Sequence, residues 1–136
     1  MTIFDRTMRL LERTLDLRSG RQRVIASNLA NEETPGYRAS ELTFMDQLRS
    51  AHKGRLPIVL AATQSGHFGL QGPQGMQSVT GKLNEVPAGD IPLDANSVNL
   101  ELEMAKLSEN VMQYNAAATI LAKKFNGLLS AIREGR

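Results

Sequence analysis

The spacing of apolar residues over 98–133 constrains the fold more than any other feature of this sequence. Steps of four and three residues separate its members without a gap, which places them on one helical face for about five heptads. At 1.5 Å per residue this helix extends roughly 50 Å. Its partner is either a helix of the same chain or a helix of another copy, and the spacing alone does not decide between them. The stripe consists of Leu100, Met104, Leu107, Val111, Tyr114, Ala118, Leu121, Phe125, Leu128 and Ile132.

Both ends of this helix carry suitable residues. Ser97 or Asn99 is placed to cap its start. Glu101 and Glu103 follow near the positive end of the helix dipole, where carboxylates are stabilised.

A second amphipathic helix is expected over residues 2–31, at the other end of the chain. Arg18 and Gln22 interrupt its stripe around Gly20, a poor helix residue, so a weak point or bend is expected there. Neither helix buries its stripe alone, so the two must pair with each other, with other copies, or both. The stripe consists of Phe4, Met8, Leu11, Leu15, Arg18, Gln22, Ile25 and Leu29.

The first helix stops abruptly within the stretch "NLANEETPGYR" at 28–38. Pro35 has no amide hydrogen and disfavours helical geometry at Thr34, so the helix must end near Asn31. Gly36 follows at the place where a type II turn requires positive φ. The sequence therefore predicts a fixed corner after the first helix.

Two asparagines and a tyrosine surround this corner. Asn28 and Asn31 are three residues apart and share a helical face, where their amides would satisfy the last helical carbonyls or bond to a neighbouring chain. Tyr37 is placed beside the helix end, where its ring packs and its hydroxyl reaches a polar partner.

The middle of the chain differs from both ends. The turn and a short helix are expected over 32–53, with the helix at 41–51 carrying Leu42, Met45 and Leu48. Residues 54–92 hold seven of the eleven glycines and four of the five prolines, which makes regular helix improbable. This segment is predicted to be flexible or weakly β, with a short strand at "PIVLAAT" and a weak hairpin at "MQSVTGKLNEV".

Composition excludes several classes of function. The net charge is only +2, and acidic residues are interleaved with the arginines of the first helix, so no nucleic-acid partner is expected. The chain has no cysteine, and its two histidines, His52 and His67, lack a recognisable carboxylate pattern. No serine lies in a nucleophile-elbow pattern. No catalytic residue, cofactor, metal or small-molecule substrate is therefore expected.

One motif is specific enough to indicate a family. The stretch "SNLANEETPGYRA" at 27–39 resembles the signature of the bacterial flagellar rod and hook family, Asn-x-Ala-Asn-x-x-Thr-Pro-Gly-Tyr followed by a basic residue. The C-terminal stretch from "DANSVNLELEMAKL" onward resembles the end of the short proximal rod subunits of that family, although Ala95 stands where those often have glycine. The matching residues are Asn28, Ala30, Asn31, Thr34, Pro35, Gly36, Tyr37 and Arg38.

The resemblance implies a mainly α fold, in which the N- and C-terminal helices pair as a coiled coil within a single domain, 1–136. It implies a structural subunit of the proximal rod that forms a helical tube and transmits torque from the membrane ring to the distal rod and hook. Its partners would be other copies, other rod proteins, membrane-ring and ring–rod junction proteins, and the flagellar type III export apparatus. The rod lies in the periplasm, and its subunits are exported without a cleaved signal peptide.

The assembly interface expected from the two stripes consists of Phe4, Leu11, Leu15, Ile25, Leu29, Leu100, Met104, Leu107, Val111, Tyr114, Leu121, Phe125, Leu128 and Ile132. The alternative function is a soluble helical adaptor or export-associated chaperone, which also has no catalytic site. An enzyme with a site in the 54–92 segment is a second alternative.

Overall fold

The computed structural model describes residues 6–53, 78–87 and 98–134. Along the chain it has helix α1 (Arg6–Ala30), strand β1 (Ser40–Thr43), helix α2 (Met45–His52), strand β2 (Lys82–Glu85) and helix α3 (Leu100–Glu134). The prediction of a mainly α fold with long terminal helices is confirmed. No helix among these residues is long and apolar enough to cross a membrane.

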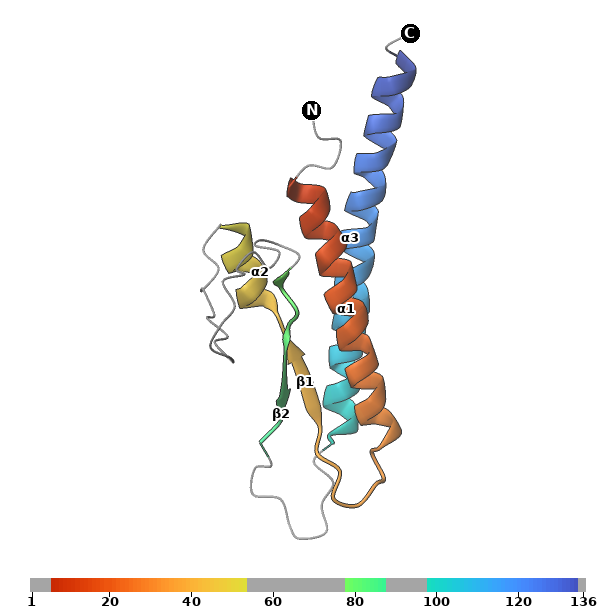
Figure 1. Cartoon of the computed structure of the whole chain (residues 1–136). Coiled ribbons are helices and arrows are strands. Elements are labelled where there is room, and N and C mark those ends of the chain that lie inside the picture. The colour runs from red at the N-terminus through yellow and green to blue at the C-terminus, as the bar shows by residue number, and fades with distance from the viewer. Residues whose placement is uncertain (1–5, 54–77, 88–97, 135–136) are drawn as a thin grey trace, which may run out of the picture.

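Helix α1 lies between α3 on one side and the two-stranded sheet on the other (Figure 1). The two long helices run side by side in opposite directions. Helix α3 has 35 residues and α1 has 25, so at 1.5 Å per residue α3 is longer by about 15 Å and its last turns extend beyond the start of α1 (Figure 1). The backbone amide of Leu102 donates to Asn99 Oδ1 at 3.0 Å, so Asn99 caps α3, one of the two caps predicted.

Gly20 lies within α1, which continues through it as one helix. A Cβ atom at this position would be 3.3 Å from Leu42 Cδ2 on β1, tighter than most side-chain contacts. The glycine thus allows the strand to lie close against the helix.

The prediction of a short helix over 41–51 is wrong for its first residues, 41–44. Residues 40–43 form β1, and α2 begins only at Met45, because Leu42 packs toward Gly20 of α1 from an extended backbone. Strand β1 pairs antiparallel with β2, with Ser40 opposite Glu85 and Thr43 opposite Lys82.

The local hairpin expected near 76–86 is also wrong, because the strand at 82–85 pairs with a strand some forty residues earlier. Within the segment expected to be flexible or weakly β, residues 78–87 are described and contain β2. The strand expected at "PIVLAAT" lies outside the described residues, as do 54–77 and 88–97.

The buried apolar cluster belongs to α1, α2, the linker residue before α2 and the segment before β2. Helix α3 contributes none of its members among the described residues. This half of the molecule therefore has a core of its own, against which α3 lies from outside. The cluster consists of Leu17, Phe44, Leu48, Ala51 and Val79, with Leu10 and Leu42 packed against it.

Candidate functional site

The corner after α1 has the geometry that its sequence predicts. The backbone amide of Tyr37 donates to the carbonyl of Thr34 at 3.2 Å, and Gly36 has φ +74° at the third position of this turn. Positive φ at this position defines a type II turn with Pro35 before it. A Cβ at Gly36 would meet nothing within 4 Å, so glycine is needed here for its backbone conformation and not for space.

Asn31 closes the end of the helix. Its Nδ2 donates to the carbonyl of Ser27 at 2.8 Å, which satisfies one of the last helical acceptors. Its Oδ1 accepts from Thr34 Oγ1 at 3.2 Å, and its carbonyl accepts from the amide of Thr34 at 3.0 Å. Asn31 therefore connects the helix end to the turn. Ala30 and Pro35 are exposed beside it.

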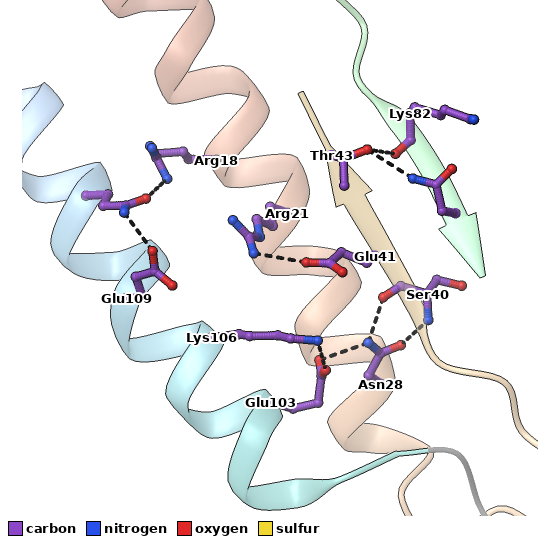
Figure 2. Close-up of polar contacts among 12 residues, drawn as sticks. Arg18, Arg21, Asn28, Ser40, Glu41, Thr43, Lys82, Glu103, Lys106 and Glu109 are labelled. Atoms are coloured by element: carbon purple, nitrogen blue, oxygen red, sulfur yellow. Dashed lines mark hydrogen bonds and ion pairs between the residues drawn. The ribbon is translucent and has the colours of Figure 1, made fainter. Parts of the chain in front are cut away.

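Asn28 is fully buried and joins three parts of the chain (Figure 2). Its Nδ2 donates to the carbonyl of Ser40 at 2.8 Å and to Glu103 Oε2 at 2.9 Å. Its Oδ1 accepts from the amide of Ser40 at 3.0 Å and from the hydroxyl of Tyr37 at 3.3 Å. One amide group thus fixes β1, the turn and α3 relative to the end of α1.

Tyr37 completes this arrangement from the turn. Its hydroxyl lies 3.2 Å from Ser27 Oγ as well as contacting Asn28. The tyrosine placed just after the stop therefore links the turn back to the last turns of α1. Its neighbour Arg38 forms a 3.4 Å ion pair with Glu85 of β2, and both side chains are exposed, so this pair contributes little stability.

Glu103 is a buried carboxylate in the first turn of α3. Lys106 Nζ lies 2.8 Å from Glu103 Oε1, and Asn28 donates to the other oxygen, so both carboxylate oxygens have partners. These hydrogen-bond and ion-pair partners matter because a buried carboxylate without partners is strongly destabilising.

A second polar contact joins α1 to α3 further along (Figure 2). Asn110 Nδ2 donates to the backbone carbonyl of Arg18 at 2.9 Å, and Arg18 Nη1 donates to Gln113 Oε1. Gln113 in turn donates to Glu109 Oε1 at 2.8 Å. The bond from Asn110 to Arg18 is buried inside the helix pair, whereas Gln113 is half-buried and Glu109 is exposed at its edge.

The guanidinium of Arg18 also lies over Phe44, with 5.7 Å between its Cζ and the ring centroid. This is a cation–π distance. Burial lowers the pKa of Arg18, the nearby Arg21 lowers it further, and Glu109 opposes both. Arg18 thus connects the α1–α3 contact to the residue that precedes α2.

The predicted stripe of α1 is buried only in part. Ile25 is buried, whereas Leu11, Leu15 and Leu29 are half-buried. Phe4 lies outside the described residues.

The predicted stripe of α3 does not coincide with the edge of the helix that faces α1. Its members Leu107, Tyr114, Leu121 and Leu128 are half-buried. The rest of the stripe that the interface prediction includes is exposed, namely Leu100, Met104, Val111, Phe125 and Ile132.

The buried positions among the described residues of α3 are instead Glu103, Asn110 and Ala117, seven residues apart and two of them polar. Apolar spacing does not identify the contact residues Glu103, Lys106, Asn110 and Gln113, because all four are polar. The heptad interval from Glu103 to Asn110 was the available signal. The described residues contain no group of three or more His, Cys, Asp or Glu side chains arranged to hold a metal ion.

The chain is similar to known proteins of one family. Residues 8–38, which run from α1 through the corner, match the family described as flagella basal body rod protein. The chain is 30% identical over 136 residues to the flagellar basal body rod protein FlgB of Salmonella typhimurium, and the match covers 96% of each chain.

FlgB of Escherichia coli is 28% identical over 135 residues, again with 96% of each chain covered. FlgB of Cereibacter sphaeroides is 29% identical over 134 residues, with 98% of each covered. The chain belongs to the flagellar basal body rod protein family. These relatives, which it matches along nearly their full length, are all named FlgB.

Proposed function

We propose that this chain is a structural subunit of the proximal rod of a bacterial flagellar basal body and has no catalytic role. Full-length similarity to proteins named as basal body rod subunits supports this proposal. The single observation in the structure that carries it is the exposed part of the apolar stripe of α3. Large side chains such as Met104, 50% exposed, and Phe125, 45% exposed, are left uncovered by the chain itself. Apolar surface of this kind marks a protein–protein contact.

The occupant of that stripe is another copy of the chain or a neighbouring rod subunit. Residues 110–122 of α3 contain no charged side chain, which suits a helix-to-helix contact away from water. The exposed side of α1 does not provide an equivalent surface, because it carries Arg9, Glu12, Asp16 and Arg23. The contact between subunits is therefore made chiefly by α3.

The same geometry suits the transmission of torque. Two long helices side by side, tied at Asn28 and again at Arg18, form a stiff unit that resists bending and sliding. The proposal further places the subunit in the periplasm, with the membrane ring, its junction with the rod and the distal rod proteins as neighbours. It leaves the cell through the flagellar type III export apparatus without cleavage of its N-terminus.

A soluble helical adaptor or export-associated chaperone is the alternative. Such a protein closes its apolar stripe in a stable soluble dimer and is absent from purified basal bodies. A rod subunit is retained in them.

The test is complementation of a non-motile strain that lacks its own FlgB. The chain, together with its natural rod partners, is expected to restore swimming, and peptides from it should be present in purified basal bodies in a fixed ratio to the other rod proteins. Restored rods that contain no peptide of this chain would refute the proposal and favour the adaptor.

A further inference from the structure

Two of the three positions of α3 that are buried among the described residues are polar. Glu103 and Asn110 are buried at this contact, 3% and 1% exposed, while the apolar stripe residues next to them, Met104 and Val111, are 50% and 36% exposed. Burial of apolar side chains is the main favourable term in helix pairing. Apolar burial alone therefore predicts that α3 turns about its axis and places Met104 and Val111 against α1 in place of Glu103 and Asn110.

The polar contacts are also imperfect. Asn110 Oδ1 and Arg18 Nε are buried, and the described residues offer neither a hydrogen-bond partner. An unsatisfied buried polar atom opposes folding. The stability of the isolated chain thus does not explain why polar residues occupy this buried contact.

The geometry of the hydrogen bonds that join α1 to Glu103 and Asn110 does explain why these polar residues lie there. The Asn28–Glu103 bond and the bond from Asn110 to the carbonyl of Arg18 connect two separate levels of α1 to two positions of α3 that are seven residues apart. Two directional contacts on one edge of a helix fix both its position along its partner and its rotation. Single buried polar residues have this effect in coiled coils, where they specify alignment at a cost in stability.

We propose that Glu103 and Asn110 are positioning residues that set the rotation of α3 on α1, so that the exposed members of its apolar stripe, such as Met104 and Val111, face outward and remain available to another subunit. The rotation of α3 on α1 concerns a single chain, so it is tested on the isolated chain. The use of the stripe as a contact with another subunit rests on the rod function proposed above.

The chain provides a convenient probe of rotation at Ala116, Ala117 and Ala118. Successive residues of a helix point about 100° apart, so the three sample different sides of α3. Ala116 is exposed, Ala117 is 7% exposed against α1, and Ala118 is half-buried. Because the sequence contains no cysteine, one introduced cysteine at each position is the sole thiol that a maleimide labels.

The experiment measures the labelling rates of Ala116→Cys, Ala117→Cys and Ala118→Cys in the dilute full-length chain. In the parent background, position 117 is expected to be the slowest, by about tenfold relative to 116, because labelling there requires local opening. In a Glu103→Ala/Asn110→Ala background, the order of 117 and 118 is expected to reverse as the stripe turns inward.

The matched control is Glu101→Ala/Asn115→Ala, which makes the same two changes at exposed positions of the same helix and should keep the parent order. If position 117 remains the slowest without Glu103 and Asn110, the inference is wrong. Fast, equal labelling at all three positions would also overturn it, since the polar contacts would then hold α3 in place without choosing its face.

Swimming is measured separately with cysteine-free versions of the same backgrounds. An unchanged labelling order together with lost motility overturns the inference and leaves the rod function intact. A reversed order of labelling rates together with normal motility supports the proposed role of Glu103 and Asn110. It argues against the stripe of α3 as the contact between subunits.

Discussion

Asn28 Nδ2 donates a hydrogen bond to Glu103 Oε2 at 2.9 Å, and the two residues are 75 positions apart in the sequence. The bond connects the last turns of α1 to the first turn of α3, so it joins the two terminal helices at the corner of the molecule (Figure 2). The same asparagine holds both backbone groups of Ser40. The family motif thus contains the residue on which both halves of the fold converge.

Asn28→Ala is expected to lower the free energy of unfolding by about 2–4 kcal/mol, because it removes several buried hydrogen bonds and leaves the groups of Ser40 and Glu103 without full satisfaction. Chemical denaturation followed by circular dichroism measures this change. Asn115→Ala is the control, since Asn115 is exposed on α3 and its side chain should contribute less than about 0.5 kcal/mol. Equal stability of the two variants would show that Asn28 is not the central residue of the corner.

A graded series at Gly36 tests the turn. Because a Cβ at this position has open space around it, any penalty is conformational. Gly36→Asn is expected to be mild, Gly36→Ala to cost about 1–2 kcal/mol, and Gly36→Val to cost more, since asparagine tolerates positive φ and β-branched residues do not.

Gly127→Ala provides the matched control for this series. Gly127 lies in α3, also with open space around its missing Cβ, but in helical conformation. The substitution should stabilise the chain by about 0.5–1 kcal/mol, as expected for a helix interior. A Gly36→Ala variant as stable as Gly127→Ala would contradict the left-handed conformation assigned to Gly36.

Tyr37 has separable contributions from its ring and its hydroxyl. Tyr37→Phe keeps the half-buried ring and removes the contacts to Ser27 and Asn28, so it should cost about 0.5–1.5 kcal/mol. Tyr37→Ala removes the ring as well and should cost more. Thermal or chemical denaturation measures the stability of both variants. Equal destabilisation by the two substitutions would show that the ring of Tyr37 contributes nothing to stability.

The sequence was sufficient for the features that depend on local chemistry. Pro35 and Gly36 determine the turn by their own backbone preferences, and the 4-3 spacing over 98–133 predicts the helix that the structure has at Leu100–Glu134. The sequence was insufficient where contacts between distant residues determine the secondary structure. Leu42 fits a helical pattern with Met45 and Leu48, yet it lies in a strand because β2 pairs with it from forty residues away.

The same limit applies to the candidate site. Periodicity identifies an apolar face on α3 but does not show which edge of the helix meets α1. That edge is selected by polar side chains with partners on another helix, as for Glu103 with Asn28 and Asn110 with Arg18. A pattern of apolar residues contains no information on such bonds.

The exposed stripe of α3 leads to the most direct test of the proposed function, because substitution there separates folding from assembly. Met104 belongs to the stripe and is 50% exposed, whereas Met112 is 71% exposed and outside it. Met104→Asp should leave the stability of the isolated chain within about 0.5 kcal/mol of the parent, since an exposed position tolerates charge. In the rod it should place an unpaired carboxylate in an apolar contact, which is strongly unfavourable.

The measurement is the yield of complete rods in basal bodies purified from complemented cells, imaged by electron microscopy alongside a swimming assay. The account predicts rods and motility for Met112→Asp and neither for Met104→Asp, with both proteins folded and present at equal levels. Complete rods and normal swimming with Met104→Asp would contradict it, because the stripe of α3 would then face solvent in the assembled structure.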